Sequence, residues 1–496
     1  MALRRFIPLC CPKSNRTFFT SACRSSDLDS PPIQEFPRLS KHQVSAILQA
    51  NEVSVEINHE AVLRFDNSRL AANSPIEDRH SEGYCNDTDG FLFGIFDGHA
   101  GVANAQAVSE RLFSYIAINL LNPAQLESFC KKMSKGEEAN LVRFLTHGNT
   151  YFNKELSTVY RDAIVKYGIE LLSTIEEWEE HFNMEQALYS AFGRLDKDME
   201  YEAFPHGHHR LNAELLANAL SGCCAVAAHV DGPHLHVANS GDCFALLGTL
   251  KEDGCWEAKP LSVPHNVENN AEQHRLYEAH PNEKGTVIKD GRLLGTLAPT
   301  RAFGDFRFKL PASRLREVGK MLRSKIYTGE EFRALPNHYF DPPQYYYTPP
   351  YVTALPQVHY HHLRPIDKFL ILATDGLWDK FPNNDAKVVQ LVADHMVGAQ
   401  TIADFQLPKD RKLELGELND LLNIRKSNIA KRAEDSNCAT HLIRNAIGQT
   451  ELDISHGKLS AMLTLPGNVV RHFRDDITVT VVYFDETYLK RNLKVT

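Results

Sequence analysis

The sequence predicts an α/β fold in which strands pair antiparallel instead of forming a series of βαβ units. Three short segments with strand propensity follow one another closely, at 223–229, 235–238 and 244–247, and glycine-containing turns separate them. This spacing is typical of an antiparallel meander. The preceding segment, 185–202, repeats apolar residues at helical intervals. No G-x-G-x-x-G or Walker loop stands at a strand–helix junction, which argues against nucleotide-dependent classes.

Length and composition narrow the class of protein. The 496 residues exceed a typical domain, but one elaborated enzyme domain can have this length. The 63 acidic and 54 basic residues give a net charge of −9, and no long basic block suggests a nucleic-acid binder. No apolar run is long enough to span a bilayer, so we expect a soluble protein without a transmembrane segment. The ten cysteines contain no C-x-x-C pair, which favours reduced, buried thiols.

The first 26 residues have the composition of a mitochondrial transit peptide. They are rich in serine and threonine, contain no acid before Asp27, and carry five basic residues: Arg4, Arg5, Lys13, Arg16 and Arg24. We expect cleavage between Cys23 and Asp27, followed by a linker or N-terminal extension at 27–59. The alternative is an ordinary disordered N-terminus. The leader predicts import into the mitochondrial matrix.

The segment 91–101 gives the clearest indication of chemistry. An apolar strand-like run at 91–96 ends in Asp97-Gly98-His99, and a helical pattern follows at 102–116. A buried strand is therefore expected to carry a carboxylate and an imidazole to its end, where a hard metal ion and a proton donor could meet. The alternative is a strand–turn–helix in which Asp97 caps the helix and His99 is solvated.

Further acids stand at or near the ends of predicted strands. They are Glu77-Asp78 after 61–72, Asp242 in a turn, Asp375 after 368–374, Asp379 just beyond, and Asp475-Asp476 before the last strand, 477–484. Each taken alone could be a turn acid. Together they form an oxygen-rich set without thiols that suits Mg²⁺ or Mn²⁺. Two such ions could bridge a hydroxide and neutralise a phosphoryl group during in-line attack.

Three stretches are expected to be insertions, near 122–183, 309–350 and 400–432. The second contains a basic helix at 314–325 and then many aromatic residues. It could contact a protein partner or pack on its own domain. Further helices are expected at 41–51, at 385–395 and around 439–446.

Six motifs occur in a fixed order along the chain. They are Glu77-Asp78, Asp97-Gly98-His99-Ala100-Gly101, Gly241-Asp242, Arg301-Ala302-Phe303-Gly304-Asp305, Thr374-Asp375-Gly376-Leu377-Trp378-Asp379 and Asp475-Asp476-Ile477-Thr478. Through them most of residues 60–485 resembles the metal-dependent serine/threonine protein phosphatases of type 2C, the PPM family. Three stretches are similar to those of pyruvate dehydrogenase phosphatase catalytic subunits: Asn-Ser-Pro-Ile-Glu-Asp-Arg at 73–79, Val-Ser-Glu-Arg-Leu-Phe at 108–113 and Arg-Ala-Phe-Gly-Asp at 301–305. The transit-like leader agrees with that narrower resemblance.

The resemblance implies a fold and a metal site. The fold would be an α/β sandwich of two central antiparallel β-sheets flanked by helices, in a phosphatase domain at 60–485 with a C-terminal tail at 486–496. Two Mg²⁺ or Mn²⁺ ions would lie at one edge between the sheets. The implied ligands are Asp97 as a bridge, the carbonyl of Gly98, Asp375 and Asp475, with Asp78 and Glu77 holding bound waters and Asp242 and Asp379 holding a third, weaker ion. His99 would be the general acid.

Two departures from the family pattern concern the substrate site. Many relatives carry an arginine a few residues before Glu-Asp to grip the phosphate, where this chain has Asn73. Asparagine lacks the charged, bidentate fork of arginine, so Asn73, Arg79 and Arg301 are all candidates for binding the phosphate. The usual Gly-Asp-Ser-Arg reads Gly-Asp-Cys-Phe at 241–244. We expect Cys243 to be a buried structural thiol.

The expected reaction is hydrolysis of phosphoserine by metal-activated hydroxide. By resemblance, the substrate is the phosphorylated pyruvate dehydrogenase component, which dephosphorylation reactivates. Similar enzymes dock on the lipoyl-bearing acetyltransferase core, and a regulatory subunit is a further expected partner. One alternative is a mitochondrial phosphatase for another phosphoprotein, such as the branched-chain dehydrogenase. A different alternative is a catalytically silent scaffold.

Overall fold

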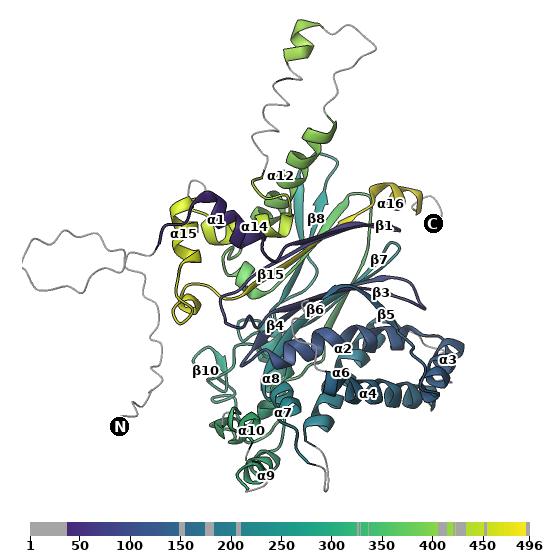
Figure 1. Cartoon of the computed structure of the whole chain (residues 1–496), viewed down its shortest axis with the longest axis vertical. Helices are drawn as coiled ribbons and strands as arrows, with labels where there is room; N and C mark the ends of the chain where they lie inside the picture. Colours follow the sequence, from purple (N-terminus) through teal and green to yellow (C-terminus); the bar gives the residue numbers. More distant parts are fainter. Residues whose placement is uncertain are drawn as a thin grey trace, which may run out of the picture.

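The computed structural model describes residues 37–492 apart from 148–153, 174–182, 205–209, 325–326, 328, 336, 405–413, 420–421, 423–432 and 451–453. Its centre is a sandwich of two β-sheets with helices on both outer faces (Figure 1). All named strand pairs are antiparallel. The predicted α/β sandwich is therefore confirmed. The predicted transit peptide, 1–26, and most of the third insertion lie outside the described residues.

The first sheet has six strands in the order β1-β2-β15-β14-β8-β9. They are β1 (Val53–His59), β2 (Val62–Leu70), β15 (Ile477–Phe484), β14 (Asp367–Ala373), β8 (Phe244–Leu250) and β9 (Trp256–Pro260). Every residue of β15 is buried, as its run of β-branched and aromatic residues predicts. Four helices accompany this sheet (Figure 1): α1 (Lys41–Gln49), α12 (Asp385–Asp404), α14 (Cys438–Gly448) and α15 (His456–Leu463).

The second sheet has the order β13-β7-β6-β4-β3-β5, with β12 paired to β6. The strands are β13 (Gln357–His362), β7 (His234–Ser240), β6 (Gly222–Asp231), β4 (Phe91–His99), β3 (Arg79–Cys85), β5 (Val142–His147) and β12 (Phe303–Gly304). The helices on its outer side are α2 (Ala103–Leu120), α3 (Pro123–Ser134), α4 (Lys154–Ser173), α6 (Met184–Ala203) and α7 (Ala213–Leu220) (Figure 1). α3, β5 and α4 occupy the first predicted insertion.

The two sheets enclose an apolar core. Phe65 of β2 meets Phe93 of β4 edge to face with ring centroids 5.6 Å apart, and both side chains are fully buried. Burial of each such ring contributes about 2–3 kcal/mol. This packing fixes one sheet against the other, so that strand ends from both sheets meet at a common edge.

Shorter elements complete the chain. They are α8 (Asn270–Ala279), β10 (Ile288–Lys289), β11 (Arg292–Leu293), η1 (Phe306–Phe308), α9 (Ala312–Leu322), α10 (Glu330–Arg333), η2 (Asn337–Phe340), α11 (Asp375–Trp378), η3 (Val470–His472) and α16 (Glu486–Asn492). Part of the aromatic stretch after α9 packs on its own domain, whereas Tyr347 is 66% exposed. Phe340 is buried, and Tyr346 donates a 2.6 Å hydrogen bond from its hydroxyl to the carbonyl oxygen of Leu310.

Two sequence predictions need correction. β6 and β7 form a hairpin, but β8 leaves the predicted meander and pairs with β14 and β9 in the other sheet. The chain crosses between the sheets at Gly241, whose φ is +111°. The prediction failed because the alternation of residues in a strand does not show which sheet the strand joins. The helix predicted to end at His395 runs on to Asp404.

Candidate metal and phosphoryl-transfer site

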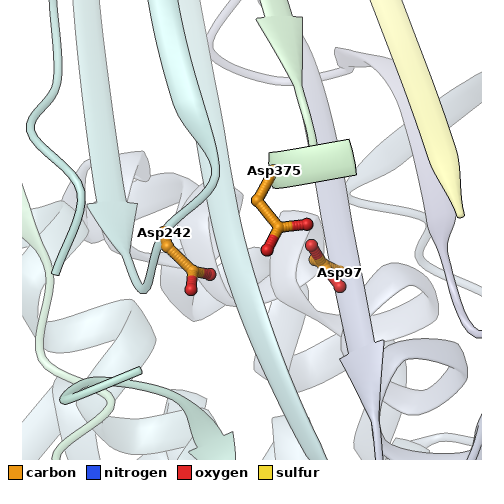
Figure 2. A group of neighbouring side chains, drawn as sticks. All are labelled: Asp97, Asp242 and Asp375. Carbon is orange, nitrogen blue, oxygen red and sulfur yellow. The ribbon is translucent and has the colours of Figure 1, made fainter. Parts of the chain in front are cut away.

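Three aspartates from different parts of the chain face one another at the common edge of the sheets. Asp97 lies in β4, Asp242 in the turn between β7 and β8, and Asp375 is the first residue of α11, directly after β14. One carboxylate oxygen of each lies within 4.8 Å of those of the other two. Figure 2 shows the three side chains converging. Within the described part of the chain, this is the one acidic group that meets this distance criterion.

Electrostatics make this cluster unfavourable without a counter-charge. Burial, together with the negative charges of Asp375 and Asp78, raises the pKa of Asp97 well above its usual range. Burial and the charge of Asp242 do the same to the pKa of Asp375. Crowded carboxylates become stable when they bind a proton or a cation. A donor set made only of oxygen fits a hard divalent cation such as Mg²⁺ or Mn²⁺.

Asp78 lies behind the cluster in a fixed orientation. Its side chain is 1% exposed and accepts hydrogen bonds from the hydroxyls of Thr374 (3.0 Å) and Thr478 (2.7 Å). Thr478 lies in β15 of the first sheet and Thr374 directly follows β14 of that sheet, whereas Asp78 directly precedes β3 of the second. Burial and the neighbouring charge of Asp476 raise the pKa of Asp78. Segments from both sheets therefore hold a further carboxylate near Asp97 and Asp375.

The adjacent acids Asp475 and Asp476 have different environments. Asp476 is buried and accepts hydrogen bonds from the amides of Ala72, Asn73 and Glu77, so it fixes the loop before β3. Asp475 keeps 43% of its side chain exposed. Asp475 and Asp379 lie outside the three-aspartate group, but their charges raise the pKa of Asp375.

Gly98 and Glu77 form the wall next to Asp97. A Cβ on Gly98 would lie 3.0 Å from the Cβ of Ala105 and would collide with the carbonyl oxygen of Glu77. Only glycine therefore fits between these segments. Glu77 accepts a 2.7 Å hydrogen bond from the amide of Gly101 on Oε1, and its Oε2 is buried without a hydrogen-bond partner.

His99 is paired with a carboxylate to which the sequence analysis gave no role. Its Nε2 lies 2.7 Å from Oδ2 of Asp305, which is itself buried. Burial opposes protonation of the imidazole, but the charge of Asp305 outweighs it and raises the pKa of His99. The pairing of β12 with β6 places Asp305 there, 206 residues after His99. The motif containing Asp305 was visible in the sequence, but this long-range contact was not.

The three residues considered for gripping phosphate are engaged within the fold. Arg79 is 1% exposed and donates to the side-chain oxygen of Gln106 and to the backbone carbonyls of Ile76 and Asp78. Arg301 pairs with Glu272 at 2.6 Å and donates to the carbonyl of Leu355. The side-chain amide of Asn73 donates to the carboxylate of Asp476. The structure therefore does not present the guanidinium groups of Arg79 and Arg301 to the acidic site, which corrects that expectation.

Two further expectations concern Cys243 and the membrane. Cys243 is fully buried, and burial raises the pKa of its thiol well above the usual range, as for an unreactive core residue. Among the described residues, no helix combines the length and apolarity required to cross a bilayer.

Comparisons with known proteins identify relatives over nearly the whole chain. The family model described as "Protein phosphatase 2C" matches residues 125–409. Mitochondrial [pyruvate dehydrogenase [acetyl-transferring]]-phosphatase 1 of Bos taurus is 43% identical over 457 residues, which cover 90% of this chain and 83% of the relative. The corresponding phosphatase 2 of Homo sapiens is 43% identical over 460 residues, covering 90% and 84%.

A solved structure matches more distantly. It is a serine-threonine phosphatase 2C from Toxoplasma gondii, with a TM-score of 0.42 and 16% identity, covering 88% of this chain and 99% of the other. That likeness is too low to support an argument about this chain.

Proposed function

The chain belongs to the protein phosphatase 2C family, and from this premise we propose that it dephosphorylates and thereby reactivates the pyruvate dehydrogenase component of the pyruvate dehydrogenase complex. It is a metal-dependent protein serine/threonine phosphatase, a [pyruvate dehydrogenase (acetyl-transferring)]-phosphatase. The observation that carries the substrate assignment is 43% identity to two pyruvate dehydrogenase phosphatases over 90% of the chain. The converging aspartates beside a carboxylate-paired histidine support the chemistry.

The acidic site would hold two Mg²⁺ or Mn²⁺ ions. Asp97, Asp375, Asp475 and the carbonyl of Gly98 are the proposed ligands, with Asp78 and Glu77 acting through water. Asp242 and Asp379 would hold a third, weaker ion. Divalent cations at such a site supply an activated water for attack on phosphorus and neutralise the charge of the phosphoryl group.

The remaining chemistry belongs to side chains of this protein. His99, whose pKa the charge of Asp305 raises, would act as a general acid through Nδ1, because its Nε2 is bonded to Asp305, and would give the Nδ1 proton to the departing serine oxygen. Because the leaving alkoxide is strongly basic, this proton lowers the barrier to breaking the phosphorus–oxygen bond. Asp305 fixes the imidazole in place, and the two threonines that bond to Asp78 keep that carboxylate in its orientation.

The relatives also support a location and partners. Their names place them in mitochondria, and this chain is mitochondrial on the same grounds. We assign it to the matrix, where the leader would deliver it, with docking to the lipoyl-bearing acetyltransferase core and a regulatory subunit as further partners. Expression of the full chain and of a chain without residues 1–26, each fused to a fluorescent protein, tests import. Retention of mitochondrial localisation by the shortened chain would contradict the transit peptide.

Phosphate release separates an enzyme from a silent scaffold. Wild-type protein and Asp375→Asn are incubated with phosphorylated pyruvate dehydrogenase, with Mg²⁺ and with chelator. We expect release only from the wild type with Mg²⁺, because Asp375 belongs to the proposed ligands. Binding of the phosphorylated substrate without release would favour the scaffold.

A further inference from the structure

Beside the proposed metal ions, the sequence motifs supply no free guanidinium group to bind the oxygens of the substrate's phosphate. A phosphoserine group carries close to two negative charges at neutral pH, and the edge that receives it contains several carboxylates. Asn73 is neutral, and Arg79 and Arg301 are engaged inside the fold. We propose that Arg471 is the residue that grips the substrate's phosphate. This inference rests on the proposed phosphatase function and adds a substrate-binding residue to it.

Arg471 reaches the rim of the site from η3. Its Nη2 lies 3.3 Å from both carboxylate oxygens of Asp475, and its Nη1 lies 3.5 Å from Oε2 of Glu77. It therefore bridges two separate segments, the loop before β3 and the loop before β15. Both segments carry acids that we assign to the metal site. The guanidinium thus lies where the phosphate has to arrive.

The contacts of Arg471 are weak enough to be exchanged. Distances of 3.3–3.5 Å are at or beyond the long end of hydrogen bonding, and the side chain is 50% exposed. A structural arginine looks different: Arg474 is buried and donates a 2.7 Å bond to the carbonyl of Ala71. The planar fork of an arginine matches the oxygens of a phosphate and gives charge-assisted bonds. Arg471 has such donors at the surface, whereas Arg474 is committed to the fold.

Other nearby cations fit this role less well. Arg307 donates to the carbonyl of Asp341 and lies over the ring of Tyr339, on the Asp305 side of the site. Lys380 interacts electrostatically with Asp379 and Asp475, but its ammonium donates to the carbonyl of Phe473 and has no bidentate fork. Lys380 is therefore a matched control for removal of one positive charge next to the same acids.

The test compares wild type with Arg471→Ala, Arg471→Lys, Arg307→Ala and Lys380→Ala. Calorimetric titration measures the Kd of inorganic phosphate at saturating Mg²⁺, and a separate titration measures the Kd of Mg²⁺ itself. Steady-state kinetics on p-nitrophenyl phosphate give kcat and KM. Circular dichroism verifies that each variant is folded, which we expect for a half-exposed position.

We expect Arg471→Ala to weaken phosphate binding and raise KM by about 10- to 100-fold, the cost of losing hydrogen bonds to a charged group. Arg471→Lys retains the charge but loses the fork, so it recovers only part of the affinity. Lys380→Ala changes the phosphate Kd by less than about threefold. This pattern, with the Kd of Mg²⁺ unchanged, would support the assignment.

Two results would overturn it. One is an unchanged phosphate Kd in Arg471→Ala, including the case in which only the Kd of Mg²⁺ changes, which would make the residue an ion-pair partner that neutralises or orients Asp475. The other is a loss of phosphate affinity in Lys380→Ala that equals the loss in Arg471→Ala, or a larger loss of phosphate affinity in Arg307→Ala. These probes do not require pyruvate dehydrogenase. The wild type could fail to dephosphorylate pyruvate dehydrogenase while Arg471→Ala still weakened the binding of inorganic phosphate. That pair of results would contradict the proposed substrate and support the role of Arg471.

Discussion

Gly222→Ala should disable the general acid without substituting His99 or any acidic residue. Gly222 opens β6, directly opposite His99 in the register between β4 and β6. A Cβ added there would lie 2.5 Å from Oδ2 of Asp305 and closer still to Nε2 of His99. Non-bonded heavy atoms rest about 3.5 Å apart, so the histidine and its partner have to retreat by about 1 Å.

The size and the substrate dependence of the effect both follow from this geometry. Misplacement of a catalytic group by about 1 Å costs roughly 100-fold in rate. We therefore expect kcat for a phosphoserine peptide to fall about 100-fold in Gly222→Ala. p-Nitrophenolate leaves without needing a proton, so kcat for p-nitrophenyl phosphate should fall far less. The clash itself should destabilise the fold by about 1–3 kcal/mol.

The assay measures kcat on both substrates at saturating Mg²⁺, with thermal unfolding to establish that the variant is folded. Gly285→Ala is the matched control, because a Cβ there would meet no atom within 4 Å. Equal losses on the two substrates, or wild-type kcat on the phosphoserine peptide, would refute the role of His99 as the acid.

Three further predictions test neighbouring parts of the account. Asp305→Asn should lower kcat on the phosphoserine peptide at least about tenfold. The alkaline limb of its pH–rate profile should move to lower pH, because the carboxylate that raises the pKa of His99 is lost. An alkaline limb at the wild-type pH would contradict this. In chelator, Asp375→Asn should raise the free energy of unfolding by on the order of 1 kcal/mol, since one repelling carboxylate disappears. Its activity with Mg²⁺ should be abolished. A lower free energy of unfolding in chelator would contradict the proposed repulsion between the carboxylates. For Glu272, burial opposes ionisation, but hydrogen bonds from Arg301, Arg275 and Thr300 lower its pKa to about 2. Its stabilisation is therefore full above the ordinary glutamate pKa and is lost as pH falls toward about 2, so Glu272→Gln should cost about 3 kcal/mol at pH 7 and nothing near pH 2 in denaturant titrations. A difference between Glu272→Gln and wild type that did not depend on pH would contradict that linkage.

The sequence predicted the site best where motif and strand end coincide. The run at 91–96 predicted a buried strand that carries Asp97 and His99, and the structure has that strand in β4. The same logic placed Asp375 after β14 and Asp475 before β15. Apolar strands flanked by acids are local features, and residue order alone reveals them.

The remaining features depend on long-range contacts. The order of residues does not show that β8 crosses to the other sheet or that β12 brings Asp305 to His99. Arg79 and Arg301 carry the right charge for a phosphate, but the long-range contacts of the fold bury Arg79 and pair Arg301 with Glu272. The exposure of Arg471 is equally a product of packing. Residue type predicts what a side chain can do, and tertiary structure decides which partner it has.

The most direct test of the central claim is release of phosphate by the wild-type protein from two phosphorylated substrates, pyruvate dehydrogenase and the branched-chain dehydrogenase. Each reaction is run with Mg²⁺ and with chelator. We expect Mg²⁺-dependent release from pyruvate dehydrogenase and far slower release from the branched-chain enzyme. Release from the branched-chain enzyme alone would contradict the proposed substrate, and no release from either by folded protein with Mg²⁺ would contradict the proposed activity.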